Sequence, residues 1–380
     1  MGFILPFVSS AHYVVGIVND ALDGTEANMR EVVIWNKANG ISDNLTDVIG
    51  PNGNSHQDNM YLIDCELLDS PCNVGDELQI KVYDLGDNYV SYVLDLNVTG
   101  AGYDLAGNIS LNSPVSFSSV LVEDAINLTL NEIDLLTNNT REVICETVLE
   151  DFDGDNITNI FSEFFSDDNS FFGDIEDNNY HYTNSSCFVN ESYGNENQSK
   201  VFCSYDVWYY ANSENWKCVI NAADNLTNAT GEDLTYINGL LSIEVVDSLD
   251  FGSMFNKNVS DEFEIVVHNR GNIFLDLSLS GYGATIGDGY SMICSGGDNI
   301  DVGYKKYNFS SFAGDLNLFE FESNYINLTS LPFTNDFNLG FRQNDLINDA
   351  YNSTYWRIYV PQGVGGSCQG NIIFGAVISV

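Results

Sequence analysis

Short runs in which apolar and polar residues alternate recur along the whole chain, separated by clusters of Gly, Asn and Asp. Residues 77–83 and 275–279 are examples, and in the second run Leu275, Leu277 and Leu279 share one face. Period-two alternation is typical of strands with one buried face, whereas helical periodicity is scarce here. Such strands bury their apolar faces as two packed sheets or a barrel. The pattern therefore predicts an all-β protein of tandem β-sandwich domains.

The strand-and-turn pattern divides into three segments after an apolar stretch at residues 1–11. We expect one sandwich at residues 12–115, a second at 122–238 and a third at 240–380. A chain of 380 residues fits two or three domains of ordinary size. Near the end, residues 363–366 are rich in glycine and predict a flexible turn.

The first eleven residues are an apolar run followed by small residues, like the end of a secretory signal peptide. The run lacks a basic start and is too short to span a bilayer. It could instead insert as a strand into a neighbouring subunit, and residues 371–380 form a second apolar stretch of one strand's length. No other run is long enough for a transmembrane helix, so no membrane span is predicted.

Composition favours packed cores on an acidic surface. Hydrophobic residues make up 44% of the chain and aromatic residues 13%, which argues against global disorder. The net charge is −43, from 55 acidic against 12 basic residues. A chain of this charge repels nucleic acid and anionic lipid and attracts divalent cations. We therefore exclude nucleic acid as a partner.

Acceptor triplets for N-linked sugar, Asn-x-Ser/Thr, are in excess. A random distribution of 47 Asn and 51 Ser and Thr would give about six, whereas the chain has fifteen. They lie at Asn44, Asn97, Asn108, Asn127, Asn138, Asn156, Asn184, Asn190, Asn197, Asn225, Asn228, Asn258, Asn308, Asn327 and Asn352. N-linked sugar is added outside the cytoplasm, so the excess predicts an extracellular glycoprotein. The alternative is accident in an Asn-rich sequence.

Eight cysteines without a Cys-x-x-Cys pair, together with only four His, argue against zinc and for disulfides in an oxidising compartment. Each segment holds an even number, so pairing within segments is simplest. This predicts Cys65–Cys72 in the first segment and Cys294–Cys368 in the third. In the second segment three pairings are open, and we prefer Cys145–Cys218, packed near a Trp, with Cys187–Cys203. Free buried thiols are the alternative.

Residues 151–159 resemble a calcium loop, because carboxylates at alternate positions can converge where the chain curls at a glycine. The predicted ligands are the side chains of Asp151, Asp153 and Asp155, the carbonyl of Ile157, and Asn159 or Glu163. The glycine stands at position four rather than six of an EF-hand, and the loop contains the sugar acceptor Asn156. The alternative is an acidic turn between two strands.

No catalytic motif is present. The chain has no Gly-x-Ser-x-Gly, no His-Glu-x-x-His and no phosphate-binding glycine loop, so no enzyme is predicted. A carboxylate pair of the glycosidase type stays open among 55 acids. The aromatic residues could line a sugar-binding face, although core packing is the commoner use of such residues. They are Trp208, Tyr209, Tyr210, Trp216, Tyr355 and Trp356.

Three sets of motifs resemble modules of secreted archaeal surface proteins. Val14-x-Gly-x-Val18 and residues 75–82 are similar to transthyretin-like (carboxypeptidase-regulatory-like) sandwiches. The early Cys145, the acidic loop and residues 216–224 resemble Ig-like or PKD-type sandwiches, and residues 355–361 with Cys368 resemble a closing Ig-like domain. The resemblance implies architecture and not activity.

These observations predict a non-enzymatic extracellular structural protein that self-associates as a homopolymer, in a pilus-like filament or a surface layer. Strand exchange through residues 1–11 or 371–380 is the favoured mode of assembly. The alternative is an adhesin that binds carbohydrate or other surface proteins. A secreted hydrolase is a third hypothesis.

Overall fold

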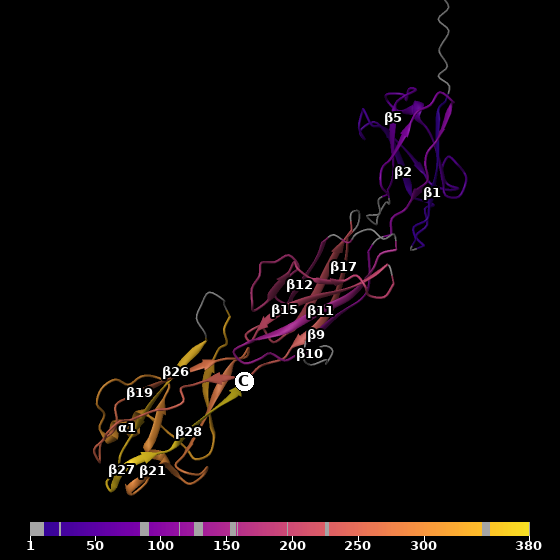
Figure 1. The fold of residues 1–380 in the computed structure, drawn as a ribbon. Coiled ribbons are helices and arrows are strands. Elements are labelled where there is room, and N and C mark those ends of the chain that lie inside the picture. The colour runs from indigo at the N-terminus through magenta and orange to yellow at the C-terminus, as the bar shows by residue number, and fades with distance from the viewer. Residues whose placement is uncertain are drawn as a thin grey trace, which may run out of the picture.

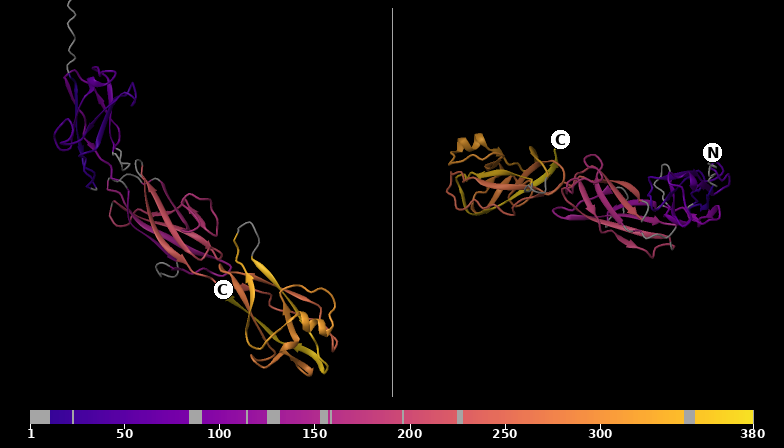
Figure 2. Two further views of the ribbon diagram at one scale, coloured as in Figure 1. Left: turned by 180° about the vertical axis from the view of Figure 1, so that it is seen from behind. Right: turned by 90° about the horizontal axis from the view of Figure 1, so that it is seen from above.

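A computed structural model describes residues 11–379 except 23, 84–90, 114, 125–131, 153–156, 158, 196, 225–227 and 344–349. The chain is all-β, as predicted, and forms three β-sandwich modules arranged in an elongated row (Figure 1). The first and third modules lie at opposite ends of the row, and both views of Figure 2 show the same order. The C-terminal end lies where the second and third modules meet (Figure 1).

The first module packs two four-stranded sheets. One has the order β4-β1-β7, with β8 also paired to β1, and the other has the order β3-β2-β5-β6. Alternation in β1 sends Val14, Gly16 and Val18 inward, and a Cβ at Gly16 would overlap the ring of Tyr61. The elements are β1 (Tyr13–Asn19), β2 (Glu31–Asn36), β3 (Asn44–Val48), β4 (Met60–Asp64), the 3₁₀ turn η1 (Cys65–Leu67), β5 (Glu77–Tyr83), β6 (Leu94–Asn97), β7 (Tyr103–Leu105) and β8 (Ile109–Ser110).

The second module packs a five-stranded sheet, β10-β17-β16-β12-β13, on a four-stranded sheet, β14-β15-β11-β9. The fully buried Trp216 stacks on Phe164 at 4.8 Å in the core between them. Strand β9 begins at Ser116, so residues 116–121, outside both predicted segments, belong to this sandwich. The strands are β9 (Ser116–Asp124), β10 (Glu132–Ile133), β11 (Thr140–Glu150), β12 (Asn159–Ser166), β13 (His181–Asn184), β14 (Phe188–Asn190), β15 (Gln198–Trp208), β16 (Asn215–Ala223) and β17 (Asn228–Ile237).

The third module has a five-stranded sheet, β18-β19-β26-β23-β24, and two three-stranded sheets, β25-β20-β28 and β22-β21-β27. Its strands are β18 (Ile243–Glu244), β19 (Phe263–Asn269), β20 (Leu275–Tyr282), β21 (Tyr290–Gly297), β22 (Ile300–Asp301), β23 (Lys305–Asn308), β24 (Ile326–Asn327), β25 (Phe333–Leu339), β26 (Tyr351–Ile358), β27 (Val364–Gln369) and β28 (Asn371–Ile378). The 3₁₀ turn η2 (Val302–Tyr304) and the helix α1 (Leu318–Asn324) complete it.

The joint between the second and third modules is held by buried amides. Asn272 donates from Nδ2 to the carbonyl of Ala211 at 2.8 Å and accepts from the N–H of Leu240 at 2.6 Å. Asn179 donates to the carbonyls of Tyr210 and Arg342, each at 2.8 Å. Because buried amides are costly to leave unpaired, these bonds fix the two modules relative to each other.

Candidate functional site

The chemistry-bearing features fall into four groups: disulfides, acceptor asparagines, buried polar networks and exposed apolar surfaces. All four disulfides join cysteines of the same module, and the described chain has no free cysteine. The pairs are those preferred from sequence: Cys65–Cys72, Cys145–Cys218, Cys187–Cys203 and Cys294–Cys368. Four disulfides indicate a protein of an oxidising compartment.

The second-module pairs lie side by side in the core. Cys145 and Cys203 are direct register partners on β11 and β15, yet each bonds to a different strand or loop. Cys145 crosses to Cys218 on the opposite sheet, while Cys203 bonds Cys187, which precedes β14. The first bond therefore ties the two sheets together, and the second fixes the edge of one sheet.

Twelve of the fifteen acceptor asparagines lie in the described residues, and none of those twelve is buried. Asn127, Asn156 and Asn225 lie outside the described residues. Eight of the twelve are exposed: Asn44, Asn97, Asn108, Asn138, Asn228, Asn258, Asn327 and Asn352. The other four are partly exposed: Asn184, Asn190, Asn197 and Asn308. The side chains of Asn184 and Asn190 accept from the N–H two residues on, at 2.7 and 3.1 Å, which forms local turns at the surface.

The predicted calcium loop is only partly within the described residues, because Asp153 and Asp155 lie outside them. Asp151 is buried just after β11, whereas Asn159 is exposed at the start of β12. Glu163 lies four residues further along β12 than Asn159, roughly 13 Å away at the rise of a strand. Its carboxylate accepts from the N–H of Gly173 at 2.6 Å and faces His181, so Glu163 has partners outside residues 151–159. Calcium binding by the remaining residues stays a prediction.

A network of buried polar side chains joins Glu163 of β12 to His181 of β13 and to Ser170, which lies between the two strands. Nδ1 of His181 lies 2.8 Å from Oγ of Ser170, and Nε2 lies 3.3 Å from Oε2 of Glu163. Ser, His and Glu in this order have the composition of a nucleophilic triad. His181 is fully buried, however, and stacks on Phe165 at 5.3 Å, so a substrate has no access to it. The arrangement is structural.

The aromatic residues considered for sugar binding are mostly core residues. Tyr209, Tyr210, Trp216 and Trp356 are buried, Tyr355 is partly exposed, and Trp208 is 37% exposed. Tyr210 is further covered by the guanidinium of Arg342, 4.4 Å from the ring centroid. These side chains therefore do not form the exposed platform that a carbohydrate-binding module needs.

An apolar surface lies on the outer face of the β4-β1-β7 sheet. Register places Val15 of β1 beside Leu62 of β4 and Leu105 of β7. Leu105 is 70% exposed, and Tyr103, two residues before it on the same face, is 57% exposed. This sheet is thus apolar on both faces, and exposed apolar patches are a common feature of interaction surfaces.

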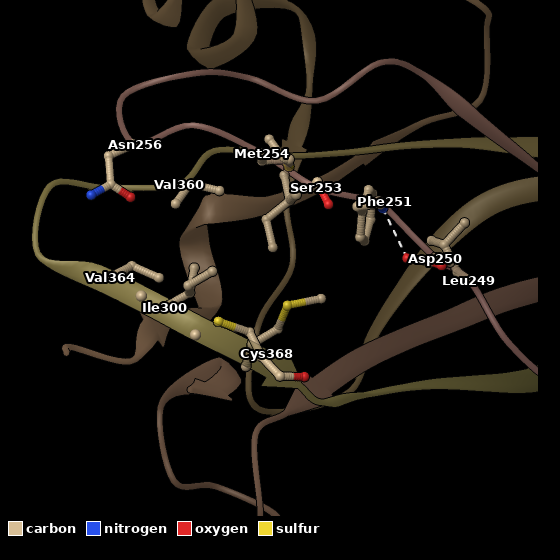
Figure 3. Close-up of a pocket in the computed structure, with 16 residues that line it drawn as sticks. Leu249, Asp250, Phe251, Ser253, Met254, Asn256, Ile300, Val360, Val364 and Cys368 are labelled. Atoms are coloured by element: carbon tan, nitrogen blue, oxygen red, sulfur yellow. Dashed lines mark hydrogen bonds between the residues drawn. The ribbon is translucent and has the colours of Figure 1, made fainter. Parts of the chain in front are cut away.

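A groove of about 550 Å³ lies at the outer end of the third module. One wall is the loop at residues 249–256 and the other is β27, and Figure 3 shows Phe251 and Met254 on the loop and Val364 and Cys368 across from them. Sixteen residues line it, and Asp250 is the one acidic residue among them. The lining residues are Leu249, Asp250, Phe251, Gly252, Ser253, Met254, Asn256, Met292, Ile300, Ile358, Val360, Val364, Gly365, Gly366, Ser367 and Cys368.

The groove was missed from sequence. Residues 363–366, predicted as a flexible turn, lead into and form the start of β27, which pairs with β21. Residues 371–380, the second segment predicted to exchange between subunits, contain β28, which is already paired within its own chain. All eight residues of β28 pair with β20, from Asn371 beside Tyr282 to Ile378 beside Leu275. Exchange through that end would require breaking this ladder.

No helix among the described residues is long and apolar enough to cross a membrane. No family model matches the chain, and no curated protein matches it. Distant likeness to solved structures is found. The major pilin subunit of Bacillus cereus is 9% identical, with 96% of this chain and 95% of that chain covered and a TM-score of 0.32.

Two further structures show likeness at the same level. A three-Ig fragment of titin, I67–I69, is 10% identical over 94% of this chain and 95% of that chain, with a TM-score of 0.29. A chaperone–tip adhesion subunit complex from Acinetobacter baumannii pili is 8% identical over 64% of this chain and 96% of that chain, with a TM-score of 0.30. These similarities concern tandem β-sandwich architecture alone.

Proposed function

We propose that the chain is an extracellular structural subunit that polymerises end to end into a surface filament. The observation that carries the proposal is the arrangement of three disulfide-bonded sandwiches in a row, with an exposed apolar sheet face on the first module and a groove with a single acidic residue on the third. A contact between unlike ends of one chain repeats without closing and generates a fibre. Sugar on the exposed acceptor asparagines would keep the sides of such a fibre from sticking.

Charge sets the conditions for assembly. Subunits of net charge −43 repel one another, so only contacts that exclude charge can hold them together. Because the Debye length falls from about 30 Å at 0.01 M salt to about 10 Å at 0.1 M, salt and divalent cations should promote polymerisation. The same charge makes nucleic acid an unfavourable partner.

The test is electron microscopy of the full chain, produced in a secretory host that forms disulfides and adds N-linked sugar. We expect concentration-dependent fibres, one subunit wide or more, whose axial repeat is close to the length of the three-module row. Fibres should be fewer at low salt. A chain that stays monomeric at all salt and calcium concentrations would contradict the proposal. Binding of that monomer to surface glycans would support the adhesin alternative instead.

A further inference from the structure

We propose that the groove at the outer end of the third module receives residues 3–8 of a second copy of this chain, which add as a strand to β27. The proposal rests on the filament function and deepens it by naming the contact between subunits. Three observations carry it: an open strand edge, an incomplete apolar cluster beside that edge, and the positions of the two elements at opposite ends of the molecule.

The open edge belongs to β27. This strand is the last of the β22-β21-β27 sheet and pairs on one side only, with β21. None of the described backbone hydrogen bonds joins it to the loop at 249–256 across the groove. A Cβ on Gly365 or Gly366 would meet Gly296 or Ser295 of β21, so these glycines permit the close pairing with β21. The unpaired N–H and C=O groups of an edge are the groups that an added strand uses.

The cluster beside this edge is incomplete. Its buried members are Ile300, Ile358, Val360 and Val364. Six further hydrophobic residues pack against them only in part, namely Phe251, Met254, Met292, Cys294, Tyr304 and Cys368. In Figure 3 Met254 lies on the loop, across the groove from Cys368. Apolar side chains inserted between the loop and β27 would remove this surface from water, which is favourable at about 25 cal/mol per Å².

The segment at residues 3–8 has the matching chemistry. It reads Phe-Ile-Leu-Pro-Phe-Val, and residues 1–11 contain no charged side chain, in a chain with 55 acidic residues. As a strand it would place Phe3, Leu5 and Phe7 on one face. If those residues bond to β27, the missing N–H of Pro6 falls on the outer edge, where proline is tolerated. The single acid of the groove, Asp250, already accepts from the N–H of Gly252 at 2.8 Å.

The geometry favours a contact between copies. Strand β1 runs parallel to β8, and the chain continues from β8 to β9 of the second module. The start of β1 therefore lies at the end of the first module that is remote from the second, while β27 lies at the far end of the third (Figure 1).

His12 anchors that starting point, because its N–H donates to Asp64 at 3.0 Å and its ring lies 2.6 Å from Asp104. If extended, the ten residues before Ala11 would span about 33 Å, whereas the six residues of β27 span about 20 Å. The segment is therefore long enough to pair along the whole of β27.

Two other features leave the groove open to this occupant. The apolar strand β28 of the same chain is already paired with β20 along its whole length. None of the fifteen acceptor asparagines lines the groove, and the nearest in sequence is Asn258, two residues past the lining residue Asn256.

The first experiment places the photo-crosslinker p-benzoylphenylalanine at Leu5 of the full chain and maps the products by mass spectrometry after polymerisation. We expect crosslinks between copies, mainly to Met254, Met292 and residues 364–368. Crosslinks that fall instead on the outer face of β1, or within one copy, would overturn the assignment of the groove while leaving the filament in place.

A matched pair of variants tests the groove itself. Met254→Asp places a carboxylate in the groove, whereas Phe255→Asp makes the same change at the neighbouring residue, which is 81% exposed and does not line the groove. We expect Met254→Asp to raise the critical concentration for polymerisation at least tenfold and Phe255→Asp to change it less than twofold. Thermal unfolding by circular dichroism checks that both variants fold. Equal effects of the two would contradict the proposal.

A peptide experiment separates the groove from the filament. All the described strands lie within residues 11–379, so we expect a chain that lacks residues 1–10 to fold, and circular dichroism checks this. A fluorescent peptide of residues 2–10 should bind it, with at least tenfold weaker binding to Met254→Asp by anisotropy. Binding without polymerisation of the full chain would retain the groove and refute the filament. No binding, or binding that Met254→Asp does not weaken, would refute the groove.

Discussion

The second module and the outer end of the third module both contain buried apolar residues and a disulfide, but the two hydrophobic cores differ in how completely they are buried. Twenty buried residues form one continuous cluster in the second module, whereas the outer end of the third holds only four, with partly buried neighbours around them. Each contains a disulfide between residues about equally far apart, 73 residues for Cys145–Cys218 and 74 for Cys294–Cys368. A disulfide and a set of apolar residues are therefore not enough to give a fully buried core.

The difference lies in what faces each sheet. Cys145 and Cys218 belong to two sheets that cover each other, so their bond runs through the core. Cys294 and Cys368 are register partners on neighbouring strands of one small sheet, and across the groove from it lies a loop. A bond within a sheet fixes its strands but covers no apolar face, which leaves that face to a partner.

The largest expected effect is the loss of the bond between the two sheets of the second module. Cys145→Ala with Cys218→Ala should lower the free energy of unfolding by about 4 kcal/mol, because the bond closes a long loop in the unfolded chain. Urea unfolding followed by hydrogen-exchange mass spectrometry would read the second module separately. Cys65→Ala with Cys72→Ala, which removes a bond between cysteines only seven positions apart, should cost about 2 kcal/mol. A larger loss from the short loop would contradict the entropic explanation.

Truncation of one phenylalanine in each region compares the two cores directly. Phe164 is fully buried against Trp216, so Phe164→Ala should cost about 3 kcal/mol through lost contacts and a cavity. Phe251 is partly exposed at the groove and touches Phe263 edge-on at 5.3 Å, so Phe251→Ala should cost about 1 kcal/mol. Similar losses of unfolding free energy for the two variants, measured by urea unfolding of each module, would mean that the core at the outer end of the third module is as fully buried as that of the second.

A buried amine further weakens the outer end of the third module. Lys305 donates to the carbonyl of Ser291 at 3.3 Å, and burial lowers its pKa to about 8. Lys305→Met should therefore raise the free energy of unfolding by about 1–2 kcal/mol at pH 7, since a buried charge is replaced by an apolar group of similar size.

The direction in which stability changes with pH gives a control for the Lys305→Met prediction. Between about pH 8 and the ordinary lysine pKa the unfolded chain binds more protons than the folded one, so stability of the unsubstituted protein rises with pH there. Lys305→Met should lack this rise. A variant that is destabilised at pH 7, or that keeps the rise, would show that the amine is not the cause.

Sequence patterning predicted the parts that depend on neighbours along the chain. The all-β architecture and the inward alternation of Leu275, Leu277 and Leu279 follow from period-two runs. It missed the helix α1, although Asn317 and Glu320 form a capping box that is visible as a motif. It could not give the groove, because residues from distant segments line it. For the second-module cysteines it left three pairings open, and the preferred pairing is the one found, although Cys145 lies directly beside Cys203.

The smallest perturbation that separates the two regions is mild reduction of the folded protein. Thiol exchange requires access to a sulfur atom, and Cys145 and Cys218 are fully buried, whereas Cys294 and Cys368 are partly exposed and Cys368 lines the groove. Low dithiothreitol followed by alkylation and mass spectrometry should therefore label Cys294 and Cys368 well before Cys145 and Cys218. In polymerised protein the order should persist but the labelling of Cys368 should slow, because a strand added to β27 covers that side of the groove. Labelling that is unchanged on polymerisation would show that the groove stays open in the fibre, and early labelling of Cys218 would show that the second core is not closed.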